Sequence, residues 1–197
     1  MTPTEIANLA LGHIGESKIA DYDEQSPVAE VIRTAWANTR DVCLRMFRWN
    51  FATARVALSA VDAPADESFG YAYQLPADYL RCLEFNAVDA AHSLTQFRIE
   101  GTQILSDDEA ANLRYIRRVE NPAEWDPSFV RAFSFKLAAT VAPRLTNSSA
   151  AADRQNAAFA DAIADAKQAN AIESKPTVVL ATARSRFVEA GYGSSDL

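Results

Sequence analysis

Residues 26–48, with the sequence SPVAEVIRTAWANTRDVCLRMFR, carry the clearest helical periodicity of the chain. Apolar side chains recur at steps of three and four residues, and polar side chains occupy the positions between them. Ser26 suits the cap position and Pro27 the first helical position. The stretch therefore predicts a long amphipathic helix over residues 27–48. Its expected apolar face is Val28, Val31, Ile32, Ala35, Trp36, Thr39, Val42, Cys43, Met46 and Phe47, and its expected polar face is Glu30, Arg33, Asn38, Arg40, Asp41, Arg45 and Arg48.

Three further segments carry helix start signals. Thr2, Pro3 and Glu5 have the spacing of a capping box, and glycines 12 and 15 predict the end of that first helix. Asp126 and Pro127 predict a third helix over residues 127–142, which is expected to stop at Pro143. An alanine-rich helix is predicted over residues 149–174, capped by Asn147 or Ser148.

The region between the second and third helices has strand signals. Residues 71–119 contain alternating and β-branched apolar positions, and Glu100-Gly101-Thr102 is typical of a hairpin turn. The sequence predicts an α+β fold that is mainly α: a four-helix-type bundle with a small antiparallel β-sheet insertion and an extended C-terminal tail. We expect one domain over residues 1–174, with helical parts at about 1–55 and 126–174 and a β-rich insertion at about 56–125. Residues 175–197 are expected to form a docking tail.

Composition limits the function classes. The chain has 197 residues and a net charge of −7, which argues against a protein that grips nucleic acid through its phosphates. No apolar run reaches the roughly 18 residues of a membrane helix, and the N-terminus has no signal-peptide pattern. A soluble protein made in a cytoplasm is expected. Cys43 and Cys82 fit no metal or redox spacing, so we interpret them as buried, reduced and structural.

The sequence offers little chemistry. It has two histidines, His13 and His92, and lacks a hydrolase nucleophile elbow and a phosphate-binding loop. The densest acidic cluster, Asp107-Asp108-Glu109, is more typical of a solvated turn than of a catalytic carboxylate pair. We therefore predict no catalytic residue, no cofactor and no metal site. The aromatic residues near Trp49 and Tyr71 favour core or interface packing over a base-stacking platform.

Four stretches in a fixed order give a sharper indication. They are residues 9–24 (LALGHIGESKIADYDE), the turn Trp49-Asn50-Phe51-Ala52 followed by Arg55, residues 71–81 (YAYQLPADYLR), and residues 113–119 (LRYIRRV) followed by Asp126-Pro127 and Phe129. Together they resemble the head-to-tail adaptor of short-tailed bacteriophages, also called the tail tubular protein A family. The resemblance covers about residues 5–174. The residues that carry this motif are Trp49, Phe51, Tyr71, Tyr73, Leu75, Pro76, Asp78, Arg81 and Tyr115.

The resemblance implies a structural virion protein of the neck region, made in the host bacterial cytoplasm, and not an enzyme. It implies a ring of twelve copies beneath the portal, which extends the DNA channel and offers a platform to the tail nozzle or tail fibres. DNA would pass through the lumen without sequence-specific binding, and no membrane would be involved. The candidate residues for docking to the portal or a neighbouring subunit are Val179, Leu180, Arg184, Arg186 and Phe187. The alternatives are a virion-associated hydrolase, a stand-alone DNA-binding protein, or another tail-completion protein.

Overall fold

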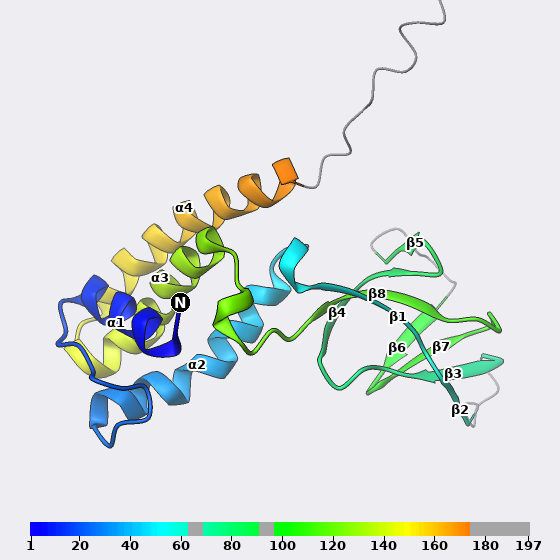
Figure 1. The fold of residues 1–197 in the computed structure, drawn as a ribbon, viewed down its shortest axis with the longest axis horizontal. Coiled ribbons are helices and arrows are strands. Elements are labelled where there is room, and N and C mark those ends of the chain that lie inside the picture. The colour runs from blue at the N-terminus through cyan, green and yellow to red at the C-terminus, as the bar shows by residue number, and fades with distance from the viewer. Residues whose placement is uncertain (63–68, 91–96, 174–197) are drawn as a thin grey trace, which may run out of the picture.

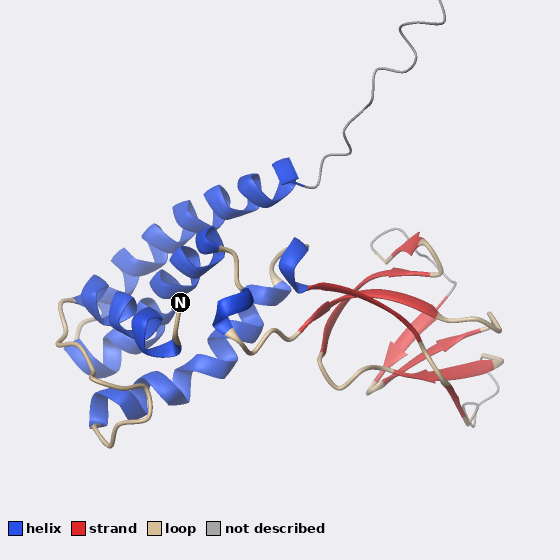
Figure 2. Cartoon of the chain, in the orientation of Figure 1, coloured by secondary structure: helices blue, strands red, loops and turns tan. Residues whose placement is uncertain are grey.

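The computed structural model describes residues 1–62, 69–90 and 97–173. Within these ranges the chain is mixed α/β, with four α-helices and two small antiparallel sheets. The helices gather at one end of the molecule and the strands at the other (Figures 1 and 2). The helices are α1 (Pro3–Ile14), α2 (Pro27–Arg45), α3 (Pro127–Thr146) and α4 (Ser149–Glu173). The strands are β1 (Thr53–Ala57), β2 (Ala60–Val61), β3 (Tyr71–Gln74), β4 (Tyr79–Phe85), β5 (Val88–Asp89), β6 (Phe97–Glu100), β7 (Gln103–Ser106) and β8 (Asn112–Arg117).

The predicted helix caps are confirmed. Thr2 and Glu5 form a capping box, in which the Thr2 hydroxyl accepts from the Glu5 N–H and the Glu5 carboxylate accepts from the Thr2 N–H. The Ser26 hydroxyl accepts from the N–H of Ala29, and the Asp126 carboxylate accepts from the first turn of α3. Gly15 ends α1 with a φ of 77°, a conformation that glycine adopts without steric cost. Local side-chain chemistry therefore sets where these helices begin.

Two predicted helix ends need correction. Helix α2 ends at Arg45 rather than at residue 48, and α3 continues through Pro143 to Thr146. Pro143 removes one hydrogen bond close to the helix end, where the buried Val141 and Ala142 and the partly buried Leu145 still hold α3 against the core.

The two faces of α2 are also not as predicted. Arg40, expected on the polar face, is only 8% exposed, whereas Val42 and Met46, expected on the apolar face, are exposed. The buried residues of α2 form one regular stripe at steps of three and four, and Val42 lies beside it; the stripe is Ala29, Ile32, Trp36, Thr39, Arg40, Cys43 and Leu44.

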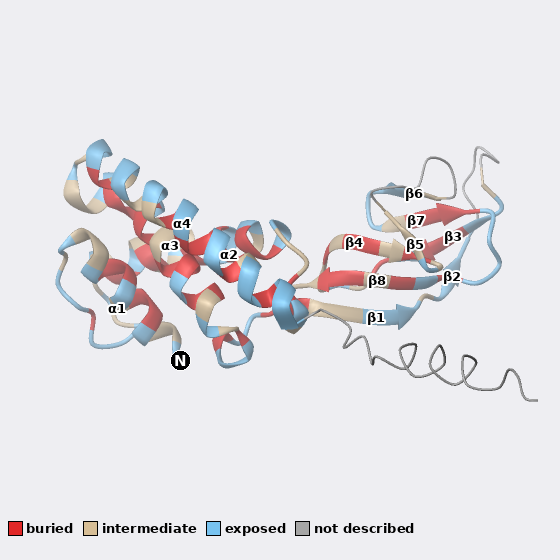
Figure 3. Cartoon of the chain, turned by 90° about the horizontal axis from the view of Figure 1, so that it is seen from above, coloured by how far each residue is buried: buried red, intermediate tan, exposed pale blue. Residues whose placement is uncertain are grey.

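Helix α3 lies at the centre of the helical body and contacts the other three helices. Phe129 and Phe133 of α3 are fully buried and meet Trp36 of α2 and Trp125, with ring centroids between 4.9 and 6.4 Å apart. The buried face of α4 supplies Phe159, Ile163 and small alanines to the same core. Buried residues run through this body and along the strands next to it (Figure 3).

The strands form two four-stranded antiparallel sheets, where the sequence predicted one sheet. The first has the order β1-β8-β4-β5 and the second the order β2-β3-β7-β6. The predicted hairpin at residues 100–102 is confirmed, because β6 pairs with β7 across Gly101, whose φ is 56°. One core cluster joins the two sheets; its members are Tyr73, Leu75, Cys82, Phe85, Ile104, Ala111, Leu113 and Tyr115.

Strand β4 contributes side chains to both the core between the sheets and the core of the helical body, because its pairing with β8 has two register shifts. Its register against β8 shifts between Tyr79 and Arg81 and again between Cys82 and Glu84. The residues inserted at these shifts, Leu80 and Leu83, are buried in the helical core rather than in the core between the sheets. An extra residue in a strand redirects a side chain to the other face, so the irregular strand can serve both cores.

None of the helices in the described ranges is long and apolar enough to cross a membrane.

Candidate functional site

The turn after α2 is fixed by Trp49, whose side chain is 1% exposed. Its indole Nε1 donates to the carbonyl of Cys43 at 3.1 Å. Trp49 and Phe51 both pack edge-on against Phe129 of α3, with ring centroids 5.1 Å apart in each case. These aromatic residues are packed into the core at the exit from the helical body.

Asn170 of α4 holds the same turn from the other side. Its side-chain oxygen accepts from the N–H of Asn50 at 2.8 Å, and its side-chain nitrogen donates to the carbonyl of Arg48 at 3.0 Å. Asn170 is 9% exposed, and sequence reasoning missed it. The available signal was its position, because Asn170 continues the buried stripe of α4 that contains Ile163 and Ala166.

Two arginines exchange backbone hydrogen bonds between α2 and β4. The guanidinium of Arg81 donates to the carbonyl of Arg45 at 3.0 Å, and the guanidinium of Arg45 donates to the carbonyl of Leu80. The sequence offers Arg81 a carboxylate partner in Asp78, three residues earlier, or in a neighbouring subunit. The structure gives Arg81 a backbone partner instead, because the end of α2 lies against the strand.

Asp78 belongs to the turn that precedes β4 and is tied to β8. Its carboxylate accepts a hydrogen bond from the hydroxyl of Tyr115 at 3.0 Å, and its carbonyl accepts from the N–H of Arg118 at 2.6 Å. Burial raises the pKa of Tyr115 to about 12, and the hydrogen bond to Asp78 adds to the rise. Pro76 is part of the same turn, in which its carbonyl accepts from the N–H of Tyr79.

The first residues of the motif lie farther from the helices. Tyr73 is buried between the sheets, and its hydroxyl donates to the carbonyl of Asp108 at 2.5 Å. Leu75 is buried in the same cluster, whereas Tyr71 is exposed and stacks on Tyr73. Thus the structure brings Asp78, Arg81 and Tyr115 to the junction with the helices and leaves Tyr71 at the surface.

A charged cluster joins α2 to the segment after β8. Asp41 accepts from Arg40 at 2.8 Å through Oδ1 and from Arg118 at 2.9 Å through Oδ2. Glu120 lies 3.9 Å from Arg40 and is exposed. One carboxylate therefore serves two guanidinium groups at the place where the chain returns from the sheets to the helices.

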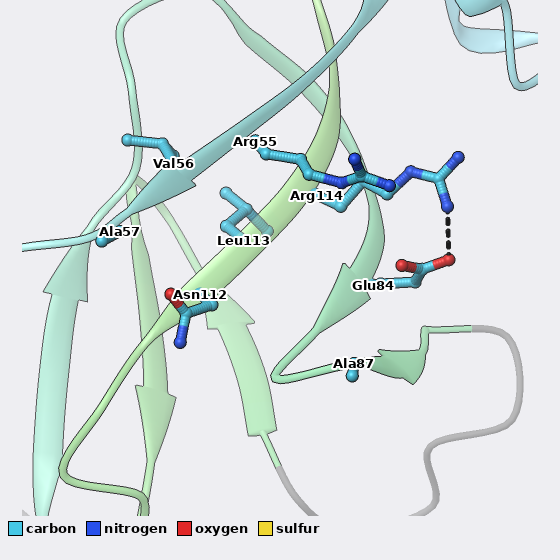
Figure 4. A pocket seen from close by; sticks show the side chains of 8 residues that line it. All are labelled: Arg55, Val56, Ala57, Glu84, Ala87, Asn112, Leu113 and Arg114. Carbon is cyan, nitrogen blue, oxygen red and sulfur yellow. Dashed lines mark hydrogen bonds and ion pairs between the residues drawn. The ribbon is translucent and has the colours of Figure 1, made fainter.

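The first sheet has a groove that is lined by residues of β1, β4 and β8 and contains three charged side chains among mostly apolar surface. Arg55 of β1 and Arg114 of β8 are direct partners in the strand register, so their side chains lie on the same face. Arg114 pairs with Glu84 of β4 at 2.6 Å, as the dashed line in Figure 4 shows. The small side chains of Ala57 and Ala87 line the rest of the groove, together with Val56, Asn112 and Leu113. Sequence reasoning missed this site, although Arg55 and Arg114 occupy alternate, outward-facing strand positions.

The acidic triplet at residues 107–109 is part of an exposed turn, as predicted. Asp107 accepts from the N–H of Gly70 at 2.9 Å, and Asp108 accepts from the side chain of Asn86 at 2.8 Å. No group of His, Cys, Asp and Glu among the described residues could hold a metal ion. The triplet thus fixes loop geometry.

The other reactive side chains are packed against the core. His13 lies 3.0 Å from the Ser134 hydroxyl and stacks on Phe135, and burial lowers its pKa. Burial raises the pKa of the Cys43 thiol to about 12 and that of Cys82 to about 11, which keeps both thiols protonated at neutral pH. His92 lies outside the described residues.

The predicted docking residues of the tail, Val179, Leu180, Arg184, Arg186 and Phe187, also lie outside the described residues. In comparisons with known proteins, no protein-family model matches the chain, and no curated protein matches it.

Proposed function

We propose that this chain is a head-to-tail adaptor subunit of a short-tailed bacteriophage, a structural virion protein rather than an enzyme. Copies of the chain would form a ring, with twelve copies expected from the family resemblance. The ring would lie under the portal, extend the DNA channel and present an attachment platform to the tail nozzle or tail fibres. The protein would be made in the host cytoplasm and reside in the neck of the virion.

One observation carries the proposal: stretches of sequence that resemble the adaptor family contact one another in the fold. Trp49 of the tryptophan turn packs on Phe129 of the last stretch. Asp78, from residues 71–81, accepts a hydrogen bond from Tyr115, which belongs to residues 113–119. Segments that are far apart in the chain therefore contact one another where the helical body joins the sheets. Such contacts are expected if these segments resemble the family because they share its fold.

The architecture supports a role in assembly. A body of four helices with strands at its other end has different surfaces at its two ends, and a closed ring needs two different surfaces on each subunit. The net charge of −7 suits a channel wall, because an acidic surface repels the DNA phosphates. In this proposal DNA passes through the lumen without being held.

The test is to measure mass by light scattering for the purified chain alone and after mixing with the portal ring of the same virus. We expect several copies to join each portal ring. A chain that never binds the portal at any ratio would refute the adaptor function. A virion-associated hydrolase would then become the leading alternative, and an activity screen on cell-wall substrates would test it.

A truncated chain that ends at residue 174 tests whether the predicted docking tail, residues 175–197, is the segment that binds the portal. Loss of portal binding in this variant, with an unchanged unfolding midpoint, would assign docking to residues 175–197. Full binding by the variant would leave the adaptor function in place and refute the tail as its docking segment.

A further inference from the structure

The side chains that line the groove on the first sheet carry more positive than negative charge. Arg55 and Arg114 are directly opposite each other on neighbouring strands, a placement that is unfavourable for like charges. Glu84 compensates Arg114. Arg55 is exposed and has no ion-pair or hydrogen-bond partner among the described residues. The groove therefore retains about one uncompensated guanidinium charge.

Arg114 also has a donor without an acceptor. Its Nε is buried and makes no hydrogen bond among the described residues, although the other end of the guanidinium binds Glu84. A buried donor left without an acceptor costs free energy, which adds to the cost of placing two arginines opposite each other. Arg55 and Arg114 reach from adjacent strands over the same face of the sheet (Figure 4).

We propose that this groove binds a carboxylate side chain from a second copy of the chain. A carboxylate is planar and can accept hydrogen bonds from two guanidinium groups at once. Access is open because β1 is the edge strand of its sheet, and the groove lining beside the arginines is partly formed by small alanine side chains. The inference rests on the proposed ring, because it names a contact between neighbouring copies.

We assign the carboxylate to the outer face of α4. Asp153 and Asp161 are exposed on this helix, and neither has an ion-pair partner among the described residues. Their spacing of eight residues places them on one side of the helix, about 12 Å apart. The exposed residues near them include Ala157, Ala160 and Ala164, whose small side chains allow another surface to approach closely.

A nucleic acid is a poorer occupant. Phosphate binding along a strand needs an array of cations, whereas this groove has two arginines beside Glu84 in a chain of net charge −7. A single carboxylate neutralises the remaining charge without bringing an excess of negative charge into the groove.

The experiment measures self-association of the full chain by sedimentation equilibrium at low salt, up to the highest soluble concentration. We expect Arg55→Glu to weaken association about tenfold or more, which is the scale of one close charge pair. We expect either Asp161→Arg or Asp153→Arg to weaken self-association by a similar factor. Combining whichever of these two substitutions has that effect with Arg55→Glu should restore self-association. The matched control is Arg98→Glu, an exposed arginine on β6 whose reversal should leave association unchanged. Equal unfolding midpoints for all variants exclude a folding defect.

Three results would overturn the inference. They are a wild-type chain that stays monomeric throughout, an Arg55→Glu variant that associates like wild type, and an Arg55→Glu variant that loses only salt-sensitive binding to duplex DNA. If Arg55→Glu weakens association while neither α4 reversal does, the assignment of α4 is wrong. None of these results bears on portal binding, which is measured separately by mixing the chain with the portal ring.

Discussion

Arg118 donates a hydrogen bond from Nε to Oδ2 of Asp41 at 2.9 Å, across 77 residues of sequence. The contact joins the end of the first sheet to α2. The other oxygen of Asp41 accepts from Arg40, which is the one charged residue that is buried in the described part of the chain. The orientation of the sheets on the helical body depends on this carboxylate as well as on the apolar core around Leu80 and Leu83.

Replacing Asp41 by alanine should therefore destabilise the fold. The change leaves the buried Arg40 without its closest carboxylate, and we expect a loss of about 2–3 kcal/mol, because breaking a buried pair strands a charge. Urea denaturation followed by circular dichroism measures it. Glu100→Ala is the control, since it breaks the exposed pair with Arg98 and should cost close to nothing. Equal midpoints for the two variants would contradict the structural role of Asp41.

The Trp49 turn gives a second prediction. Trp49→Phe removes the hydrogen bond to Cys43 and some buried volume, so we expect a loss of about 1–3 kcal/mol, and Trp49→Ala should cost about 3–5 kcal/mol. Trp125→Phe is a matched comparison, because the Trp125 indole donates to the Val119 carbonyl in the same way. If Trp49→Phe stayed within a few tenths of a kcal/mol of wild type, the turn would not be held as described.

Asn170 allows a comparison within one helix. Asn170→Ala should destabilise the protein by about 1–3 kcal/mol, because it leaves the carbonyl of Arg48 and the N–H of Asn50 without this partner. Asn156→Ala removes only an exposed contact with Lys136 and should be close to neutral. Thermal unfolding of the two variants side by side decides the matter, and a neutral Asn170→Ala would show that α4 does not fix the turn.

Alkaline pH should destabilise the fold. Burial raises the pKa of Cys43 from 9.0 to about 12 and that of Cys82 from 9.0 to about 11, so these thiols ionise more readily in the unfolded chain. The stability held by the neutral thiols is fully present below pH 9 and decreases as the pH rises above it. The free energy of unfolding should fall between about pH 9 and pH 11, and Cys82→Ala should make the slope shallower. A flat profile over this range would contradict the burial of both thiols.

Much of the helical part follows from local sequence. The caps at Thr2, Ser26 and Asp126 and the glycine at residue 15 set helix ends through contacts within one turn, so they can be inferred without the fold. The hairpin at Gly101 is local in the same way. The burial of Arg40 could not be inferred, because Arg118, which shares the Asp41 carboxylate with it, comes from a segment distant in the chain.

The sheets show the same limit. Alternating apolar residues indicate strands, yet they do not say whether the strands form one sheet or two, since pairing is decided between distant segments. The irregular register of β4, which turns Leu80 and Leu83 toward the helices, is likewise invisible in the sequence. The groove at Arg55 exists only because β1 pairs with β8 and places Arg55 opposite Arg114.

By itself, the sequence determined the helix boundaries set by caps, the hairpin and the mixed composition of helices and strands, because each depends on residues within a few positions of one another. The tertiary structure alone decided the division into two sheets, the Asn170 contact with the Trp49 turn, and the pairing of Arg55 with Arg114. These features depend on contacts between segments up to about 120 residues apart, and only the packing of the whole chain brings such segments together.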